Sequence, residues 1–342
     1  MTLKDHKNHY NVKFLKGYGH SISVKNSKII LKDNHDPFSK PEQEKWFVKN
    51  MPYEKIVLQG KGYISTEALS LLSQNNRNVI LLDNHGKPVT FMNGMMDSLT
   101  ATKYRMAQYD TFRNPSKCKY LRKQIISAKK ESQLKLLKMI GSDVAILPEK
   151  EHLASKIYFR EFAKFIPEKY QFHSRNQSFI RTSKNNATDI INVLLNYGYS
   201  VLAGEISKFV CGFGLDPYFG FMHKSHTGFQ PLVYDLIEPF RWLVDYSIFQ
   251  IANNKEKRNR IKLKEYAHTR EGNVTIEYSL IKRFLELLER QFQKERKYDF
   301  RHGKKTKDGM KSVHEITIVK ITIQNLVDFC NKHDQFNFLP VP

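Results

Sequence analysis

The sequence contains few cysteines, no long apolar run and no recognisable export signal. Its three cysteines are far apart and include no Cys-x-x-Cys pair, which excludes a paired-thiolate zinc motif and indicates no disulfide framework. A reducing compartment is the simplest interpretation. The first residues, MTLKDHKNHYNVKF, lack the apolar core of a signal peptide, and no apolar run approaches the roughly 20 residues that span a bilayer. We therefore expect a cytoplasmic protein without a membrane segment.

Acidic residues are also scarce relative to basic ones. The 342 residues include 56 Lys and Arg against 34 Asp and Glu, a net charge of +22. Such an excess favours a polyanionic partner, and nucleic acid is the leading candidate. An anionic membrane fits less well because no basic amphipathic helix with exposed aromatic residues stands out. A lysine-rich surface without any partner is the simple alternative.

The basic residues are concentrated in particular segments. Residues 101–140 contain 11 Lys or Arg and 2 acidic residues, and three segments without periodicity (169–187, 253–264 and 301–311) are also basic. Each segment alone is typical of a solvated loop. Together they predict a distributed phosphate-binding surface.

Patterning divides the chain into two regions. Residues 1–97 contain short alternating runs, among them HSISVKNSKIILK with a turn at Lys25-Asn26, and one helix, STEALSLLSQN, with Ser65 or Thr66 as its N-cap. From residue 98 to 342, apolar residues recur at spacings of three and four. We predict an α+β protein: a small N-terminal β-sandwich-like domain with one helix (1–97), then a larger all-α catalytic domain (98–342).

The segment GFMHKSHTGFQPLVYDLIEPFR places two acids in an apolar helix. Asp235 and Glu238 are three residues apart and so project from one helix face, and His223 precedes them on a loop. Carboxylates beside an apolar stripe are costly unless they are neutralised, and a divalent cation with His223 as a further ligand would do this. A solvated helix face, an ion pair with an arginine and an ordinary loop histidine are the alternatives. The absence of His-Glu-x-x-His argues against a zinc protease.

Several segments taken together resemble the CRISPR-associated endonuclease and integrase of the adaptation complex. The segment GKGYISTEALSLLSQNNRNVILLDNHGKPV is similar to the end of that family's N-terminal β-domain. EHLASKIYF resembles its Glu-Gly-x-Ala-x-x-x-Tyr helix, and NVLLNYGYSVLAGEI its central helix. GLDPYFGFMH followed by LVYDLIEPFR resembles its most specific motif. The resemblance runs from about residue 13 to the C-terminus.

The resemblance implies a metal-dependent DNA enzyme. Its expected activity is insertion of short DNA by attack of a 3′-hydroxyl on a phosphodiester, with endonucleolytic cleavage as the reverse chemistry. The implied catalytic residues are Glu151, His223, Asp235 and Glu238, of which Glu151, His223 and Glu238 would hold Mg²⁺ or Mn²⁺. His152 stands where the family has glycine, and Glu149 is an alternative first ligand.

Basic residues near these segments are the expected phosphate contacts: Lys224, Arg241, Arg175, Arg181, Lys184, Lys257, Arg258 and Arg260. The resemblance also implies a homodimer that binds DNA and the small ferredoxin-like CRISPR adaptation protein. Casposases, the integrases of mobile elements, share the fold but usually carry an added C-terminal DNA-binding region. Because this chain ends at FCNKHDQFNFLPVP, we favour the CRISPR protein over a casposase. A non-catalytic DNA-binding protein is the second alternative.

Overall fold

The chain folds into two compact units. A computed structural model describes residues 12–33, 41–53, 55–75, 77–82, 88–92, 99–175, 187–224, 229–269, 274–299, 310–331 and 336. One unit comprises Met1–Lys103 and Ser207–Leu215, and the other comprises Tyr104–Ile206 and Asp216–Pro342. The predicted division into a β-rich N-terminal region and a largely helical C-terminal region is confirmed, and the protein is α+β overall.

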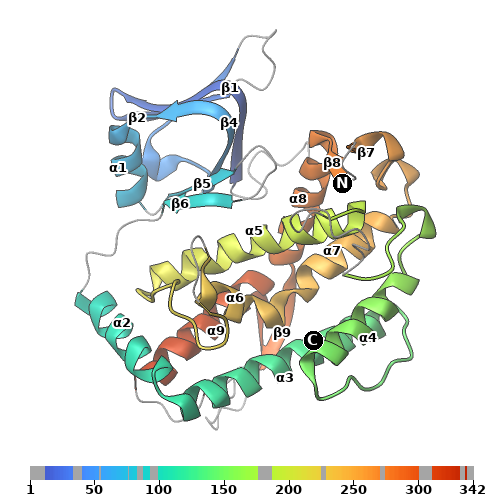
Figure 1. The fold of residues 1–342 in the computed structure, drawn as a ribbon. Coiled ribbons are helices and arrows are strands. Elements are labelled where there is room, and N and C mark those ends of the chain that lie inside the picture. Colours follow the sequence, from blue (N-terminus) through green and yellow to red (C-terminus); the bar gives the residue numbers. More distant parts are fainter. Residues whose placement is uncertain are drawn as a thin grey trace. The chain divides into compact units, whose positions relative to one another are not determined.

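The first unit is built on one six-stranded mixed sheet with the order β3-β2-β1-β4-β5-β6 (Figure 1). The strands are β1 (Val12–Lys25), β2 (Lys28–Asp33), β3 (Glu42–Trp46), β4 (Lys55–Ile64), β5 (Asn78–Leu82) and β6 (Pro88–Met92). β4 runs parallel to β1 and β5, and the other neighbours are antiparallel. Helix α1 (Thr66–Gln74) provides the crossover that a parallel β4–β5 pair requires.

Two local predictions in this unit can be compared with the structure: the hairpin turn lies one residue later than the predicted Lys25-Asn26, and the helix cap is confirmed. Asn26 and Ser27 have φ angles of 50° and 58°, which suits a two-residue hairpin turn between β1 and β2. Ser65 rather than Thr66 caps α1, because its hydroxyl accepts a hydrogen bond from the Ala68 backbone N–H at 3.2 Å. Residues 83–87, between β5 and β6, lie outside the described residues.

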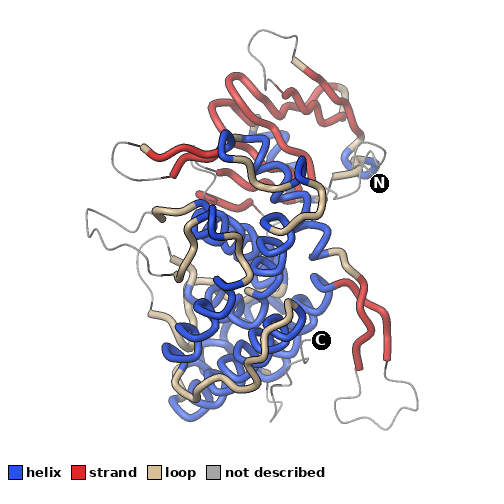
Figure 2. Tube along the Cα trace, turned by 90° about the vertical axis from the view of Figure 1, so that its right-hand side faces the viewer, coloured by secondary structure: helices blue, strands red, loops and turns tan. Residues whose placement is uncertain are grey.

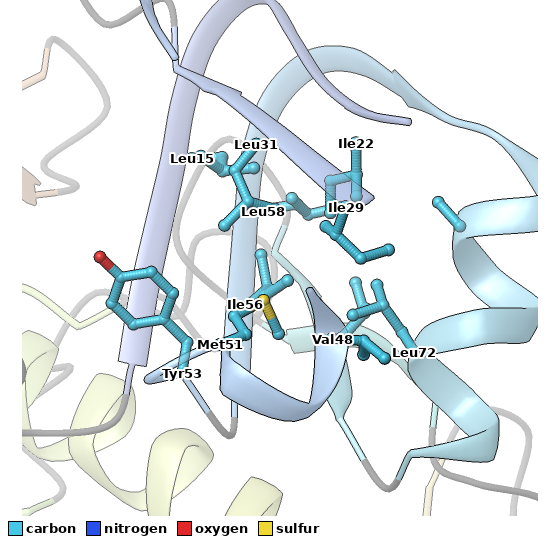
Figure 3. Close-up of a cluster of buried hydrophobic side chains, with 12 residues drawn as sticks. Leu15, Ile22, Ile29, Leu31, Val48, Met51, Tyr53, Ile56, Leu58 and Leu72 are labelled. Carbon is cyan, nitrogen blue, oxygen red and sulfur yellow. The ribbon is translucent and has the colours of Figure 1, made fainter. Parts of the chain in front are cut away.

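The core of the sheet unit is almost entirely aliphatic. Figure 3 shows side chains from β1, β2 and β4 converging on Leu72 of α1, and Leu15, Ile22, Ile56 and Leu72 are fully buried. This burial is the main source of stability for the unit, since apolar area removed from water contributes roughly 25 cal/mol per Å².

The second unit is largely helical. Its helices are α2 (Leu99–Phe112, which begins in the first unit), α3 (Pro115–Met139), α4 (Glu151–Lys164), α5 (Ile190–Gly212, which ends in the first unit), α6 (Pro231–Ile237), α7 (Trp242–Ala252), α8 (Tyr278–Phe292) and α9 (Glu315–Cys330). Short 3-10 turns η3 (Glu168–Tyr170), η4 (Glu238–Phe240), η5 (Lys257–Asn259) and η6 (Leu263–Glu265) interrupt them. No helix of the described residues is long and apolar enough to span a membrane.

Two small hairpins correct the prediction that this region is all-α. β7 (Tyr266–His268) pairs with β8 (Val274–Ile276), and β9 (Glu295–Asp299) pairs with β10 (Met310–His314). Figure 2 shows the second hairpin extending away from the helices, at the lower right. These strands are too short and too polar to give an alternating apolar pattern, so the sequence did not reveal them.

Helix α3 is central to the packing that positions the site. It contacts α4, α7 and the turn η4 that follows α6. Tight packing continues at Gly198 of α5, where an added Cβ would lie 2.4 Å from Val244 of α7 and 2.9 Å from Phe284 of α8. These contacts bring the N-terminus of α4, the middle of α3 and η4 together.

Candidate active site

Asp235 lies fully buried in α6, where its carboxylate binds the backbone of the preceding loop. Its carboxylate accepts hydrogen bonds from the backbone N–H groups of Phe221 (2.7 Å), Met222 (3.0 Å) and His223 (2.9 Å), and it lies 2.6 Å from His223 Nδ1. Four donors on one carboxylate satisfy the buried charge. An added Cβ at Gly220 would lie 2.6 Å from Asp235 Oδ2, so the loop approaches α6 too closely for a larger residue.

His223 is held in one orientation by this contact. An ionised carboxylate only accepts hydrogen bonds, so Nδ1 carries the proton and Nε2 of the neutral ring keeps its lone pair. The hydrogen bond to Asp235 raises the pKa of His223, burial opposes this, and the charges of Asp235 and Glu238 add to the rise. The contact with Asp235 therefore fixes the orientation of the ring, and Nε2 can bind a metal ion when the ring is neutral.

Helix α2 anchors the other end of the same loop. The fully buried Gln108 side chain donates to the backbone oxygens of Asp216 (2.9 Å) and Phe219 (2.8 Å) and accepts from Asp216 N–H (2.7 Å). Tyr109 donates to the Asp216 carboxylate at 2.7 Å. The loop that carries His223 is thus fixed from both sides. Neither Gln108 nor Tyr109 was predicted, because a glutamine on a helix gives no sign of a distant loop.

Glu238 is buried at the start of η4 and divides its two oxygens between two cations. Oε1 lies 2.7 Å from Arg241 Nη2, and Oε2 lies 2.7 Å from Lys129 Nζ. Burial favours the protonated form, but the charges of Arg241 and Lys129 outweigh it and hold the pKa of Glu238 below its ordinary value. Glu238 is therefore a carboxylate at neutral pH.

Glu151 reaches the same cation from another helix. It is the first residue of α4, and its Oε1 lies 2.7 Å from Lys129 Nζ. Because each carboxylate oxygen is 2.7 Å from Nζ, the oxygens of Glu151 and Glu238 are at most twice that distance apart. Glu149 is exposed ahead of the helix, and His152 is exposed on it. The geometry thus favours Glu151 over Glu149, and His152 does not obstruct it.

The place between Glu151 and Glu238 accommodates a positive charge. Lys129 occupies it now, although its contact with Glu238 Oε2 has the geometry of an ion pair rather than of a hydrogen bond. Two carboxylates and an imidazole nitrogen are donors that suit Mg²⁺ or Mn²⁺. As they stand, the described residues include no cluster of three His, Cys, Asp or Glu side chains set to hold a metal. The chemistry of this donor set suits a divalent cation.

A second set of buried residues contacts Arg241, the partner of Glu238. The Arg241 guanidinium lies over the Tyr199 ring at 4.6 Å, and Tyr199 donates its hydroxyl to Asp245 at 2.5 Å. Tyr158 donates to the other Asp245 oxygen at 2.6 Å. Burial raises the pKa of Asp245 to about 6, against the two tyrosine hydrogen bonds and the nearby arginines. Tyr199 is therefore held by a polar contact with Asp245 as well as by packing, and no local pattern in the sequence indicates this partner.

The predicted phosphate contacts lie in different settings. Lys224, Lys257 and Arg258 are exposed, although Arg258 pairs with Glu256. Arg175 donates to Asn192 and Asn196, Arg241 pairs with Glu238, and Arg260 donates to the backbone oxygen of Asn254. Arg181 and Lys184 lie outside the described residues. The role of all eight residues in binding DNA stays a prediction.

Comparison with known families gives one match over most of the chain. The profile of the family described as CRISPR associated protein Cas1 matches residues 14–149 and 141–290. The CRISPR-associated endonuclease Cas1 1 of Archaeoglobus fulgidus is 28% identical over 291 residues, which cover 72% of this chain and 81% of that protein. The CRISPR-associated endonuclease Cas1 2 of Saccharolobus solfataricus is 27% identical over 237 residues, covering 67% and 71%.

Solved structures show the same fold. A casposase bound to integration product superposes with a TM-score of 0.81 at 24% identity, covering 96% of this chain and 92% of that one. A Cas1 protein from Thermotoga maritima gives a TM-score of 0.73 at 15% identity, covering 95% and 99%. A chain of a Cas6-RT-Cas1–Cas2 complex gives 0.68 at 19% identity, covering 96% of this chain and 36% of that one.

Proposed function

Since this chain belongs to the family of CRISPR-associated protein Cas1, we propose that it is a metal-dependent DNA endonuclease and integrase. It inserts short DNA into a target by attack of a 3′-hydroxyl on a phosphodiester, as in CRISPR spacer acquisition. The observation that carries the proposal is the convergence of the Glu151 and Glu238 carboxylates on one cation, with Nε2 of an oriented His223 as a third donor on the adjoining loop.

Glu151, His223 and Glu238 would hold the metal ion, Mg²⁺ or Mn²⁺. When bound, such an ion polarises the scissile phosphate and stabilises charge on the attacking and leaving oxygens. Asp235 has no free oxygen for this role, because both of its oxygens accept two hydrogen bonds from the His223 loop. It acts by fixing the direction of the imidazole.

The other residues of the site prepare these donors. Arg241 holds Oε1 of Glu238, keeps the carboxylate ionised and leaves Oε2 toward the cation. Lys224 follows His223 directly and is exposed, which suits a contact with a DNA phosphate. Arg175, Lys257, Arg258 and Arg260 would extend the positive surface together with Arg181 and Lys184. Binding should therefore weaken steeply as salt increases.

Partners follow from the family. One structural neighbour is part of a Cas6-RT-Cas1–Cas2 complex, although at 19% identity that likeness supports the fold alone. We infer a homodimer that binds DNA and the small ferredoxin-like adaptation protein. We place its action in the cytoplasm, because chromosomal DNA lies there in archaea and bacteria such as those that carry the relatives.

The decisive experiment is strand transfer of a labelled duplex into supercoiled plasmid, with and without Mn²⁺ or Mg²⁺. The variants Glu238→Ala and His223→Ala should lose strand transfer while DNA binding in a filter assay stays within about twofold, since phosphate contacts dominate affinity. Glu149→Ala is the matched control, because Glu149 is exposed two residues before Glu151. Full activity of both site variants in Mn²⁺ would refute the assignment.

Two other functions give different results in the same experiment. A casposase-type mobile-element integrase is the first of these, because a casposase shares this fold with a TM-score of 0.81. Such an enzyme would join DNA with the same metal dependence. Sequencing the joined products distinguishes it, because its donor ends and target site differ from a spacer and a CRISPR array. A non-catalytic DNA-binding protein would show salt-sensitive binding and no metal-dependent joining.

A further inference from the structure

Lys129 is a buried lysine at the centre of the candidate site. It lies in the middle of α3, on the same face as the buried residues Ile125, Ser132 and Leu136, and only 7% of the residue is exposed. Burying an ammonium group is unfavourable unless carboxylates surround it. Its Nζ lies 2.7 Å from one oxygen each of Glu151 and Glu238, which meets that need.

Lys129 contacts both carboxylates that the proposed metal requires, and in Glu238 it contacts the one oxygen that Arg241 leaves open. Arg241 already occupies Oε1 of Glu238, so Oε2 is the oxygen open to a second cation. Carboxylate oxygens bind Mg²⁺ or Mn²⁺ at about 2.0–2.2 Å, shorter than the 2.7 Å ammonium contacts. An ammonium and a divalent ion therefore cannot share this space, since they would also repel each other at close range.

We propose that the Lys129 ammonium is a built-in competitor of the divalent ion, and that the metal binds only by displacing it. The inference rests on the proposed metal site. In the metal-free protein Lys129 holds the Glu151 and Glu238 carboxylates together and offsets their repulsion. When a metal binds, these two ion pairs break, so Lys129 sets the metal concentration at which the site fills.

The test is the affinity of the DNA-free protein for Mn²⁺. The electron paramagnetic resonance signal of unbound Mn²⁺ measures this affinity. Lys129→Met removes the competing charge and keeps a chain of similar length, so we expect Mn²⁺ to bind at least about tenfold more tightly. Lys130→Met is the matched control. Its Nζ lies 3.4 Å from the backbone oxygen of Glu149 and contacts neither site carboxylate, so affinity should change by less than about twofold.

Thermal unfolding gives a second readout. Without metal, Lys129→Met should melt below the wild-type protein, because Glu151 and Oε2 of Glu238 lose their shared cation and the two carboxylates repel each other. Saturating Mn²⁺ should raise its melting temperature more than that of the wild type. Lys129→Arg covers the case in which the methionine variant does not fold. It keeps the charge and adds a bidentate grip on carboxylates, so Mn²⁺ should bind more weakly than to the wild type.

The outcomes separate this inference from the proposed function. Equal or weaker Mn²⁺ binding by Lys129→Met, or unchanged binding by Lys129→Arg, would overturn the role of Lys129 while leaving the metal site in place. Glu238→Gln tests the site itself and should abolish the tight Mn²⁺ binding of both wild type and Lys129→Met. If tight binding persists in Glu238→Gln, the proposed metal site is wrong and the inference falls with it.

Discussion

The sheet unit and the helical unit bury different kinds of side chain. Among the described residues, the sheet strands bury polar side chains only at His20, Ser21 and Asn78, beside an aliphatic core. The helical unit buries Lys129, Asp235, Glu238 and Asp245. Burial of an apolar side chain stabilises the fold without a specific partner, whereas each buried charge requires an oppositely charged or hydrogen-bonding group beside it. The first arrangement is what a scaffold needs, and the second is what a reactive site needs.

Buried ion pairs within the helical unit show the same contrast at a smaller scale. Glu265 receives Nη1 of Arg283 on Oε1 at 2.7 Å and Nη2 on Oε2 at 2.8 Å, so a single cation pairs with both of its oxygens, and Oε2 also accepts from the Lys262 backbone N–H at 2.9 Å. Glu238 instead divides its oxygens between Arg241 and Lys129. A bidentate pair is complete, while a divided carboxylate can exchange one partner. This difference supports our proposal that Glu238 rather than Glu265 is the functional acid.

The largest effect should come from Asp235→Asn. One carboxylate oxygen becomes an NH₂ group, so two of the four donors around residue 235 would face another donor. We expect a loss of about 2–4 kcal/mol in unfolding free energy, from unpaired buried groups. Strand transfer should fall by about 10–100-fold, because the partner that orients the proposed metal ligand His223 is removed.

Urea unfolding and the strand-transfer rate measure the two effects of Asp235→Asn. Asp110→Asn, an exposed acid on α2, is the control and should match the wild type in both. If Asp235→Asn keeps wild-type activity, the loop does not depend on this carboxylate, and the contrast between scaffold and site loses its main support.

Leu72→Ala should cost a comparable amount of stability in the sheet unit, but without the loss of strand transfer expected of Asp235→Asn. Leu72 is fully buried in the cluster between α1 and the strands (Figure 3). Removing a buried leucine side chain costs about 2–5 kcal/mol. Mn²⁺ affinity per folded molecule should stay at the wild-type value, because no metal donor lies in this cluster. A loss of Mn²⁺ binding at a temperature where the variant is folded would show that the two units are coupled.

The sequence predicted local features well and long-range pairs poorly. The hairpin turn to within one residue, the helix cap at Ser65 and the proximity of Asp235 to His223 all follow from residues close in the chain. Lys129 was missed, although a lysine on the buried face of a helix requires an acidic partner. Periodicity indicates that such a partner exists but not which acid, because tertiary packing alone brings Glu151 and Glu238 to it.

Asp245 gives the helical unit a pH dependence that an aliphatic core lacks. Burial raises its pKa from the ordinary value of 3.8 to about 6, while Tyr158, Tyr199, Arg241 and Arg175 act in the opposite direction. The folded protein thus holds this proton more tightly than the unfolded chain. Stability from Asp245 is complete below about pH 4 and is lost as pH rises through about 6, by at most about 3 kcal/mol.

Asp245→Asn isolates this contribution. The variant has no proton to lose, so its unfolding free energy relative to the wild type should rise between pH 4 and 6 and level off above that. Burial also raises the pKa of Glu315, to about 7, but that acid is present in both proteins and cancels in the difference. Urea unfolding of both proteins at several pH values measures this difference in unfolding free energy. A difference that does not change with pH would mean that Asp245 titrates normally.

The smallest effects should separate two glycines of the same helix. Gly198→Ala places a Cβ 2.4 Å from Val244 and 2.9 Å from Phe284, so α5 must move away from α7 and α8, at a cost of about 1–3 kcal/mol. At Gly212 no atom lies within 4 Å of the added Cβ, and alanine there should be neutral or stabilise by up to about 1 kcal/mol. Thermal unfolding of both variants measures the difference. Because propensity favours alanine at both helical positions, opposite signs can arise only from packing, and equal effects would mean that α5 is not held tightly where it passes the site.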